Sequence, residues 1–346
     1  MPPTSEPDPT KVERRAAAKR AREEREVRIY DRYVESSERQ QRSNARLAAI
    51  GWSIATTALL VCWAMVGDFG FEWPFLPWTA ICFVAMVSSL YTWRRLSRLK
   101  SDDPAALAAQ REERRRLHDA TAAHDRKLAA RRPFSTYVLV GVIGIVSGVE
   151  AATFPDSVER AALVKAATRA GEWWRIVTAS FLHGSLLHIY YNLLSLLAVG
   201  RLLEAYLPRR HWPLVYFLAV IGGGLASVAF LPSSTSLGAS GGIMGLLALT
   251  LVFAIRRPSA APPWLKRGAW SALAINAVVG LAGFSFIDNA AHAGGAVAGA
   301  LAGWFVVDRD DARHSTVMLK ILGIAGTTAY LLLLGGALLA ILVMTI

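Results

Sequence analysis

The chain contains little cysteine. Its 346 residues include only Cys62 and Cys82, and both fall in apolar stretches long enough to cross a membrane. In such surroundings a thiol usually behaves as a small apolar side chain. We therefore assign the cysteines no chemistry, and a disulfide between them is the less favoured alternative.

Charge is also scarce inside the apolar stretches. Hydrophobic residues make up 53% of the chain and charged residues 18%, and the two kinds are segregated along it. Stretches of about 17 to 25 apolar residues predict membrane-spanning helices. The candidate spans are 47–66, 76–93, 136–153, 185–200, 212–231, 239–255, 269–286, 290–307 and 317–344. The sequence thus predicts an all-α polytopic membrane protein with about nine transmembrane helices.

Positive charge is nearly missing from one side of this predicted arrangement. With a cytoplasmic N-terminus, only Arg160, Lys165, Arg169 and Arg175 among the 38 Lys and Arg residues face outward. The positive-inside rule therefore favours that orientation. The net charge of +12 is interpreted as this orientation signal together with attraction to anionic lipid headgroups, and nucleic-acid binding is the weaker interpretation.

No cleavable signal peptide is apparent, because the first apolar run begins only at Leu47, after a long charged stretch. We expect this run to remain as an anchor. The Ala- and Arg-rich composition favours a bacterial cytoplasmic membrane.

Breaks in charge divide the chain into four predicted parts. Residues 1–46 form a basic cytoplasmic helical arm, 47–93 a transmembrane hairpin, 94–132 a charged cytoplasmic helical linker, and 133–345 the remaining spans. The outer turn of the hairpin contains five aromatic residues between 69 and 78, which are typical interfacial anchors. The hairpin carries no ionisable residue in its apolar runs, so we expect the chemistry to lie in 133–345.

Three polar clusters interrupt the later spans: HGSLLHIYYN at 183–192, GASGG at 238–242 and DNAAHAGG at 288–295. Polar residues inside a membrane indicate a functional site. His188 and Asn192 are four residues apart and project from one helix face. Ser240 and His292 lie near the starts of two other spans that run, like the span of His188, from outside to inside. The four side chains are therefore expected at one depth, close to the outer surface.

Small residues beside these groups predict close helix contacts. Gly241 and Gly245 are four residues apart, and Ala291 begins a stripe at the same spacing that continues through Gly295, Gly299 and Gly303. Ser240 and His292 flank these stripes, a placement that suits a hydrogen bond between them. A serine hydroxyl needs such an adjacent base to become a nucleophile.

These motifs resemble those of the rhomboid intramembrane serine proteases. That family carries His-x-x-x-x-His-x-x-x-Asn in its second core helix, Gly-x-Ser-Gly at the start of the fourth and Ala-His-x-x-Gly in the sixth, and this chain has all three in order. The similarity covers residues 133–345. It implies a six-helix core, here extended by the N-terminal hairpin and by one additional C-terminal helix.

The resemblance implies an intramembrane serine endopeptidase. It assigns Ser240 as nucleophile and His292 as general base, and it assigns His188, Asn192 and the Ser240 backbone N–H to the oxyanion hole. It implies no cofactor and no metal. The implied substrates are transmembrane segments of other proteins, cut near the outer membrane face after a small residue.

Further positions fit or depart from the family. Trp174 and Arg175 resemble a Trp-Arg pair in the long first loop of rhomboids, and Glu204 matches a glutamate near the inner end of the second core helix; we interpret all three as architectural. Met244 stands where many members have an aromatic residue stacked on the catalytic histidine, so we expect a less tightly held imidazole.

Other interpretations remain open at this point. The chain could be a catalytically inactive rhomboid-like protein that binds membrane clients, or a transporter, although transporter sites usually lie at mid-membrane. Zinc binding by His183, His188 and His292 is less favoured, because no carboxylate or thiol joins them. His183 is expected to have a structural role. Asp288 could orient His292 as in a triad, but a polar outer turn is the preferred interpretation.

Overall fold

The computed structural model describes residues 43–58, 76–97, 104–282 and 287–346, together with scattered positions between 18 and 40. Cys62 and most of the aromatic outer turn lie outside this part of the chain. The residues group into two compact units, Met1–Pro104 and Ala105–Ile346. In the first unit, residues 43–58 and helix α2 (Leu76–Ser97) are helical, and Cys82 is a buried free thiol.

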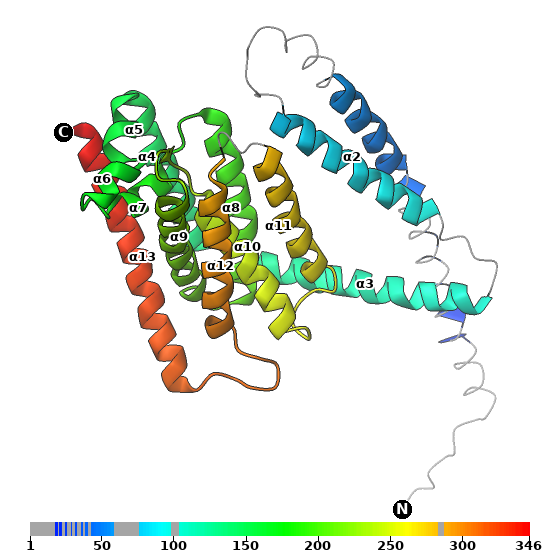
Figure 1. Cartoon of the computed structure of the whole chain (residues 1–346). Coiled ribbons are helices and arrows are strands. Elements are labelled where there is room, and N and C mark those ends of the chain that lie inside the picture. The colour runs from blue at the N-terminus through cyan, green and yellow to red at the C-terminus, as the bar shows by residue number, and fades with distance from the viewer. Residues whose placement is uncertain are drawn as a thin grey trace, which may run out of the picture. The chain divides into compact units, whose positions relative to one another are not determined.

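The second unit is almost entirely helical (Figure 1). Its longer helices are α3 (Pro104–Ala130), α4 (Phe134–Ala152), α8 (Leu186–Tyr206), α9 (His211–Phe230), α10 (Ser240–Arg256), α11 (Leu265–Ala282), α12 (Asn289–Val306) and α13 (Thr316–Thr345). The protein is therefore an all-α polytopic membrane protein, as the sequence predicted.

Four helices of the described chain are long and apolar enough to cross a membrane, namely α4, α8, α9 and α13. Helix α10 is apolar but shorter. Helices also cover the predicted spans at 269–286 and 290–307 within the described residues. The count of nine transmembrane helices stays a prediction, because several of these helices are short or carry many small residues.

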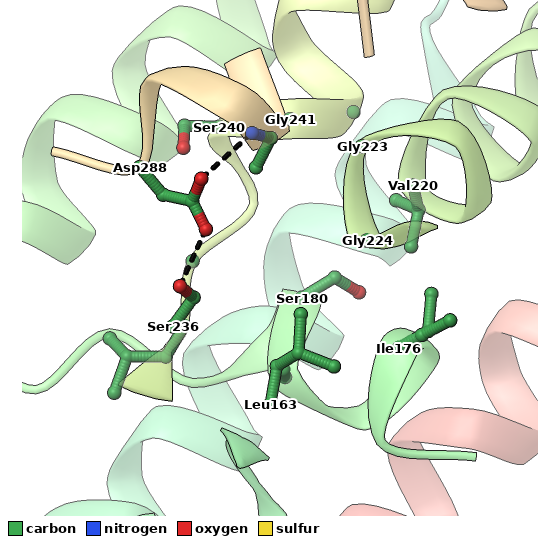
Figure 2. Close-up of a pocket in the computed structure, with 15 residues that line it drawn as sticks. Leu163, Ile176, Ser180, Val220, Gly223, Gly224, Ser236, Ser240, Gly241 and Asp288 are labelled. Carbon is green, nitrogen blue, oxygen red and sulfur yellow. Dashed lines mark hydrogen bonds between the residues drawn. The ribbon is translucent and has the colours of Figure 1, made fainter. Parts of the chain in front are cut away.

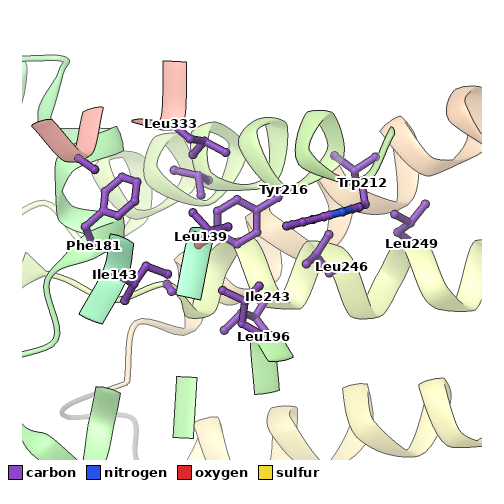
Figure 3. Close-up of a cluster of buried hydrophobic side chains, with 14 of the residues drawn as sticks. Leu139, Ile143, Phe181, Leu196, Trp212, Tyr216, Ile243, Leu246, Leu249 and Leu333 are labelled. Carbon is purple, nitrogen blue, oxygen red and sulfur yellow. The ribbon is translucent and has the colours of Figure 1, made fainter. Parts of the chain in front are cut away.

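Helix α9 occupies the centre of the second unit, since half of its apolar window is buried against other helices. It packs against α10, α12 and α13. Trp212 and Tyr216 of α9 are fully buried and meet Leu246 and Leu249 of α10 in one apolar cluster (Figure 3). Burial of each large apolar side chain contributes roughly 1.5–3 kcal/mol, so this cluster fixes α9 and α10 together.

The segment between α4 and α8 is more structured than the sequence suggested. It contains α5 (Asp156–Ala161), β1 (Leu163–Val164), α6 (Lys165–Arg169), α7 (Arg175–Thr178) and the 3-10 turn η2 (Ala179–Phe181). Strand β1 pairs antiparallel with β2 (Thr235–Ser236), so that Leu163 lies opposite Ser236. This pairing attaches the first long loop to the segment that leads into α10.

Buried polar contacts hold this architecture at the end of α8 and within the first long loop. At one end, the Glu204 carboxylate accepts hydrogen bonds from the Thr136 backbone N–H at 2.7 Å and from its hydroxyl at 2.6 Å, which ties α8 to α4. In the loop, the Arg175 guanidinium donates to the carbonyls of Glu159 and Ala162. These contacts support the architectural interpretation of Glu204 and Arg175.

Candidate functional site

Ser240 and His292 come together at the starts of two adjacent helices. Ser240 is the first residue of α10, and His292 lies in the first turn of α12. The distance between Ser240 Oγ and His292 Nε2 is 2.8 Å, which is a hydrogen bond. The serine hydroxyl can donate to Nε2, so the imidazole is placed to accept the serine proton.

The close approach of α10 and α12 depends on glycine. A Cβ atom on Gly295 would overlap the backbone of Gly241, and one on Gly299 would overlap the backbone of Gly245. These are the small-residue stripes identified in the sequence, and they face each other. Without side chains at these positions the two helix axes come close enough for Ser240 and His292 to bond.

Asp288 does not bind the His292 imidazole. One carboxylate oxygen caps α12 by accepting from the Ala291 backbone N–H at 2.8 Å, and the other accepts from the Ser236 hydroxyl (Figure 2). The same oxygen also accepts from the Ser227 hydroxyl. The buried His292 Nδ1 has no hydrogen-bond partner within the described residues. The geometry is therefore that of a Ser-His pair, and the triad alternative for Asp288 has no support in the contacts.

A buried cation faces Asp288. The Lys165 Nζ lies 3.7 Å from the Asp288 carboxylate and also donates to the Ser236 hydroxyl, and the side chain is only 1% exposed. Burial lowers the pKa of Lys165, an effect that the neighbouring Asp288 carboxylate opposes. The ion pair links the first loop, strand β2 and the start of α12.

His188 is held on the other side of the serine segment. Its Nδ1 lies 2.7 Å from the His183 carbonyl oxygen; because a carbonyl can only accept, Nδ1 carries the hydrogen. Its ring packs against Gly238, where an added Cβ would lie 2.9 Å from Nε2. Gly238 has φ of +122°, and its N–H donates to the Ala179 carbonyl. The ring therefore contacts a residue that stands two positions before Ser240 in the chain.

Asn192 lies one turn below His188 and is buried. Its side-chain amide donates to the His188 backbone carbonyl at 2.9 Å. This bond uses one of the two amide hydrogens and leaves the other available. These contacts join Ser240 directly to His292 and bring His188 against the neighbouring backbone. Asn192 lies on the same face of α8 as His188.

His183 has the structural role that the sequence favoured. It is buried, and its Nδ1 lies 3.2 Å from the Phe181 carbonyl and from the Ser147 hydroxyl. Burial and the nearby His188 lower the pKa of His183 to about 3, so the ring is neutral near pH 7. Within the described residues no group of three His, Cys, Asp or Glu side chains is arranged to hold a metal ion.

Two polar groups around the site were missed by sequence reasoning. Glu150, at the end of α4, accepts from the backbone N–H groups of His183 and Gly184, each at 2.8 Å. Lys165 was counted only as an outward-facing charge. In the sequence, Glu150 is a single glutamate at the end of an apolar span, and Lys165 is a lysine in the first loop. Neither pattern identifies the partner of the charged group.

A small pocket of about 50 Å³ adjoins Ser240 (Figure 2). Its wall includes the backbone of Gly223, Gly224 and Gly241 and the side chains of Ser236 and Asp288. Because glycines form much of its wall, the pocket is shaped by close backbone packing. Met244, one turn after Ser240, is buried in α10, and its expected effect on the imidazole stays a prediction.

Comparison with known proteins finds relatives for the region that contains these residues. Residues 170–309 match the family model described as the Rhomboid domain. The chain is 35% identical over 129 residues to Rhomboid protease GluP of Bacillus subtilis, a match that covers 37% of this chain and 25% of that protein. It is 31% identical over 146 residues to RHOMBOID-like protein 4 of Arabidopsis thaliana, covering 42% of this chain and 37% of that protein.

A further relative carries a different description. Inactive RHOMBOID-like protein 8 of Arabidopsis thaliana is 34% identical over 139 residues, which cover 38% of this chain and 37% of that protein. The chain thus spans between a quarter and about half of the length of the first curated relatives that it matches. The matched region contains Ser240, His292, His188 and Asn192. Residues 170–309 of the chain are therefore a Rhomboid domain, which together with these relatives supports membership of the rhomboid family.

Proposed function

We propose that this chain is an intramembrane serine endopeptidase that cleaves transmembrane segments of other membrane proteins near the outer membrane face. The observation that carries the proposal is the 2.8 Å hydrogen bond between Ser240 Oγ and His292 Nε2. Helices α10 and α12 contact each other through glycines, which brings the two side chains into hydrogen-bond distance. A serine with only a packing role would not require an imidazole in this position. The protease relatives support the same assignment.

In the proposed reaction Ser240 Oγ attacks the carbonyl carbon of the scissile peptide while its proton passes to His292 Nε2. The C–O bond forms as the carbonyl π bond opens to an oxyanion. Collapse of this intermediate breaks the C–N bond, and His292 returns its proton to the leaving amine. Water, deprotonated by His292, then attacks the carbonyl of the acyl-enzyme. The ester C–O bond breaks, His292 returns its proton to Ser240 Oγ, and the second product leaves as a carboxylate.

The oxyanion is proposed to bind the Ser240 backbone N–H, the second amide hydrogen of Asn192 and the Nε2 side of His188. Because His188 Nδ1 already donates to the His183 carbonyl, Nε2 can donate only when the ring carries both protons. The role proposed for His188 therefore requires a second proton on its ring when the oxyanion forms.

Cleavage of a model transmembrane substrate in liposomes tests the proposal. Ser240→Ala and His292→Ala should each lower the cleavage rate by at least about 10³-fold, because nucleophile and base act as one unit. Asn192→Ala should lower it by roughly 100-fold, the usual effect of removing one oxyanion donor. Ser234→Ala is the matched control, since Ser234 is exposed in the loop before α10 and its hydroxyl donates to the nearby Leu231 carbonyl.

The second candidate is an inactive rhomboid-like protein that binds membrane clients, which the inactive relative favours. An inactive protein of this kind predicts that the substrate stays uncleaved with both the wild-type and the Ser240→Ala proteins. Cleavage that is lost in Ser240→Ala and kept in Ser234→Ala would exclude this candidate. Cleavage that survives Ser240→Ala would refute the serine mechanism.

A further inference from the structure

Glu150 places a carboxylate inside the protein at the end of α4. The residue is 4% exposed. Its two oxygens accept separate hydrogen bonds, Oε2 from the His183 N–H and Oε1 from the Gly184 N–H, each at 2.8 Å. A buried carboxylate is costly unless it is bonded, so this pair of N–H groups is what keeps it there.

The peptide that Glu150 holds also orients His188. The N–H of His183 binds Glu150, and the carbonyl of the same residue accepts from His188 Nδ1 at 2.7 Å. That carbonyl accepts from the Ser185 N–H as well, at 2.8 Å. Gly184 follows with φ of +65°, which makes the turn tight enough for both contacts. A shift of this turn would move the acceptor on which the imidazole depends.

The opposite side of the His188 ring leaves little room to adjust. The ring contacts Gly238, and a single added carbon there would lie 2.8 Å from Cε1. Nδ1 is thus fixed by the His183 carbonyl, while Gly238 limits the position of Nε2. A displacement of the 183–184 peptide would therefore rotate or withdraw Nε2.

We propose that Glu150 is a positioning residue for the oxyanion hole, acting on the reaction through the 183–184 peptide and His188. The inference rests on the proposed function, because it gives His188 a role in stabilising the oxyanion. The Glu150 carboxylate bonds to the backbone of His183 and Gly184, and among the described residues it has no hydrogen bond to Ser240 or His292. We therefore expect replacement of Glu150 to lower the rate of the chemical step and to leave substrate binding largely unchanged.

The experiment measures kcat and KM for cleavage by the full-length chain in liposomes. Glu150→Gln keeps the size of the side chain but replaces one acceptor oxygen by a donor that faces an N–H. We expect kcat to fall about tenfold, the order expected for a lost hydrogen bond to a charged group, with KM changed less than about twofold. Glu159→Gln, at an exposed glutamate of the neighbouring short helix α5, is the matched control and should retain the wild-type kcat.

Coupling to His188 separates positioning from general stabilisation. In a His188→Ala background, where the oriented ring is gone, Glu150→Gln should change kcat less than about twofold. A further tenfold loss in that background would overturn the proposal, as would a wild-type kcat for Glu150→Gln alone. If Glu150→Gln does not yield a monodisperse protein, Glu150→Asp is measured instead. The proposal then requires that Glu150→Asp lowers kcat in the wild-type background and changes it less than about twofold in the His188→Ala background.

Ser240→Ala, measured in parallel, keeps the two proposals distinct. Persistent cleavage by Ser240→Ala would refute the proposed function itself. Cleavage that depends on Ser240 but is indifferent to Glu150 would refute only the positioning role.

Discussion

Two features of the structure require a glycine at position 238. Its φ of +122° is unfavourable for any side chain, and the space that a Cβ would fill is taken by the His188 ring at 2.8 Å. We predict that Gly238→Ala displaces His188 and lowers kcat by at least tenfold, since an oxyanion donor alone contributes roughly that or more. Cleavage assays measure the change.

Gly171→Ala is the control for backbone strain. Gly171 has φ of +120°, but no atom lies within 4 Å of an added Cβ. If Gly171→Ala lowers kcat as much as Gly238→Ala does, backbone strain alone explains the loss. That result would contradict the prediction that Gly238→Ala acts by displacing His188.

Asp288 is predicted to stabilise the fold without belonging to a triad. Asp288→Ala removes the cap of α12 and leaves Lys165 buried without its carboxylate. Loss of a cap and of one partner of a buried pair should lower the free energy of unfolding by about 2–4 kcal/mol. Titration with denaturing detergent measures this value.

Because Lys165 and Asp288 interact, Lys165→Met combined with Asp288→Ala should cost less than the sum of the single changes. Strict additivity would mean that the ion pair contributes nothing and that Asp288 acts only as a cap.

At the scale of elements, the spacing between α10 and α12 sets the distance between Ser240 and His292. An added Cβ on Gly299 would overlap the backbone of Gly245. We predict that Gly299→Ala destabilises the protein by about 1–3 kcal/mol, the usual cost of overpacking, and lowers cleavage by moving the two helix starts apart. Thermal unfolding and cleavage assays give both values.

Gly335→Ala in α13 is the matched control, because nothing lies within 4 Å of its added Cβ. Equal effects of the two substitutions would show that helix propensity, and not the α10–α12 contact, governs the result.

The elements also show how far the sequence could predict the structure. Apolar length located the helices, and glycine spacing indicated which faces of α10 and α12 meet. The motifs around Ser240 and His292 predicted a bond that the structure contains. Glu150 and Lys165 were out of reach, because their partners lie 33 or more residues away and no periodic pattern joins them. Likewise, the short helices α5 to α7 and the β1–β2 pairing depend on tertiary contacts in the first loop.

At the scale of the whole molecule, the charge distribution predicts the orientation in the membrane. The loop that contains Ser234 should lie outside, and the Arg-rich loop that contains Ser259 should lie in the cytoplasm. In a variant with both native cysteines replaced, Ser234→Cys should react with an impermeant maleimide on intact cells. Ser259→Cys should react only after permeabilisation, and the reverse pattern would contradict the predicted topology.

The central claim is that His292 activates the Ser240 hydroxyl. Reaction of the purified protein with a fluorophosphonate, followed by peptide mass spectrometry, tests it most directly. We predict a covalent adduct on Ser240 that forms in the wild type and in Ser234→Ala but is absent in His292→Ala. An unmodified Ser240 peptide from protein that cleaves substrate, or an adduct that forms equally well without His292, would contradict the account.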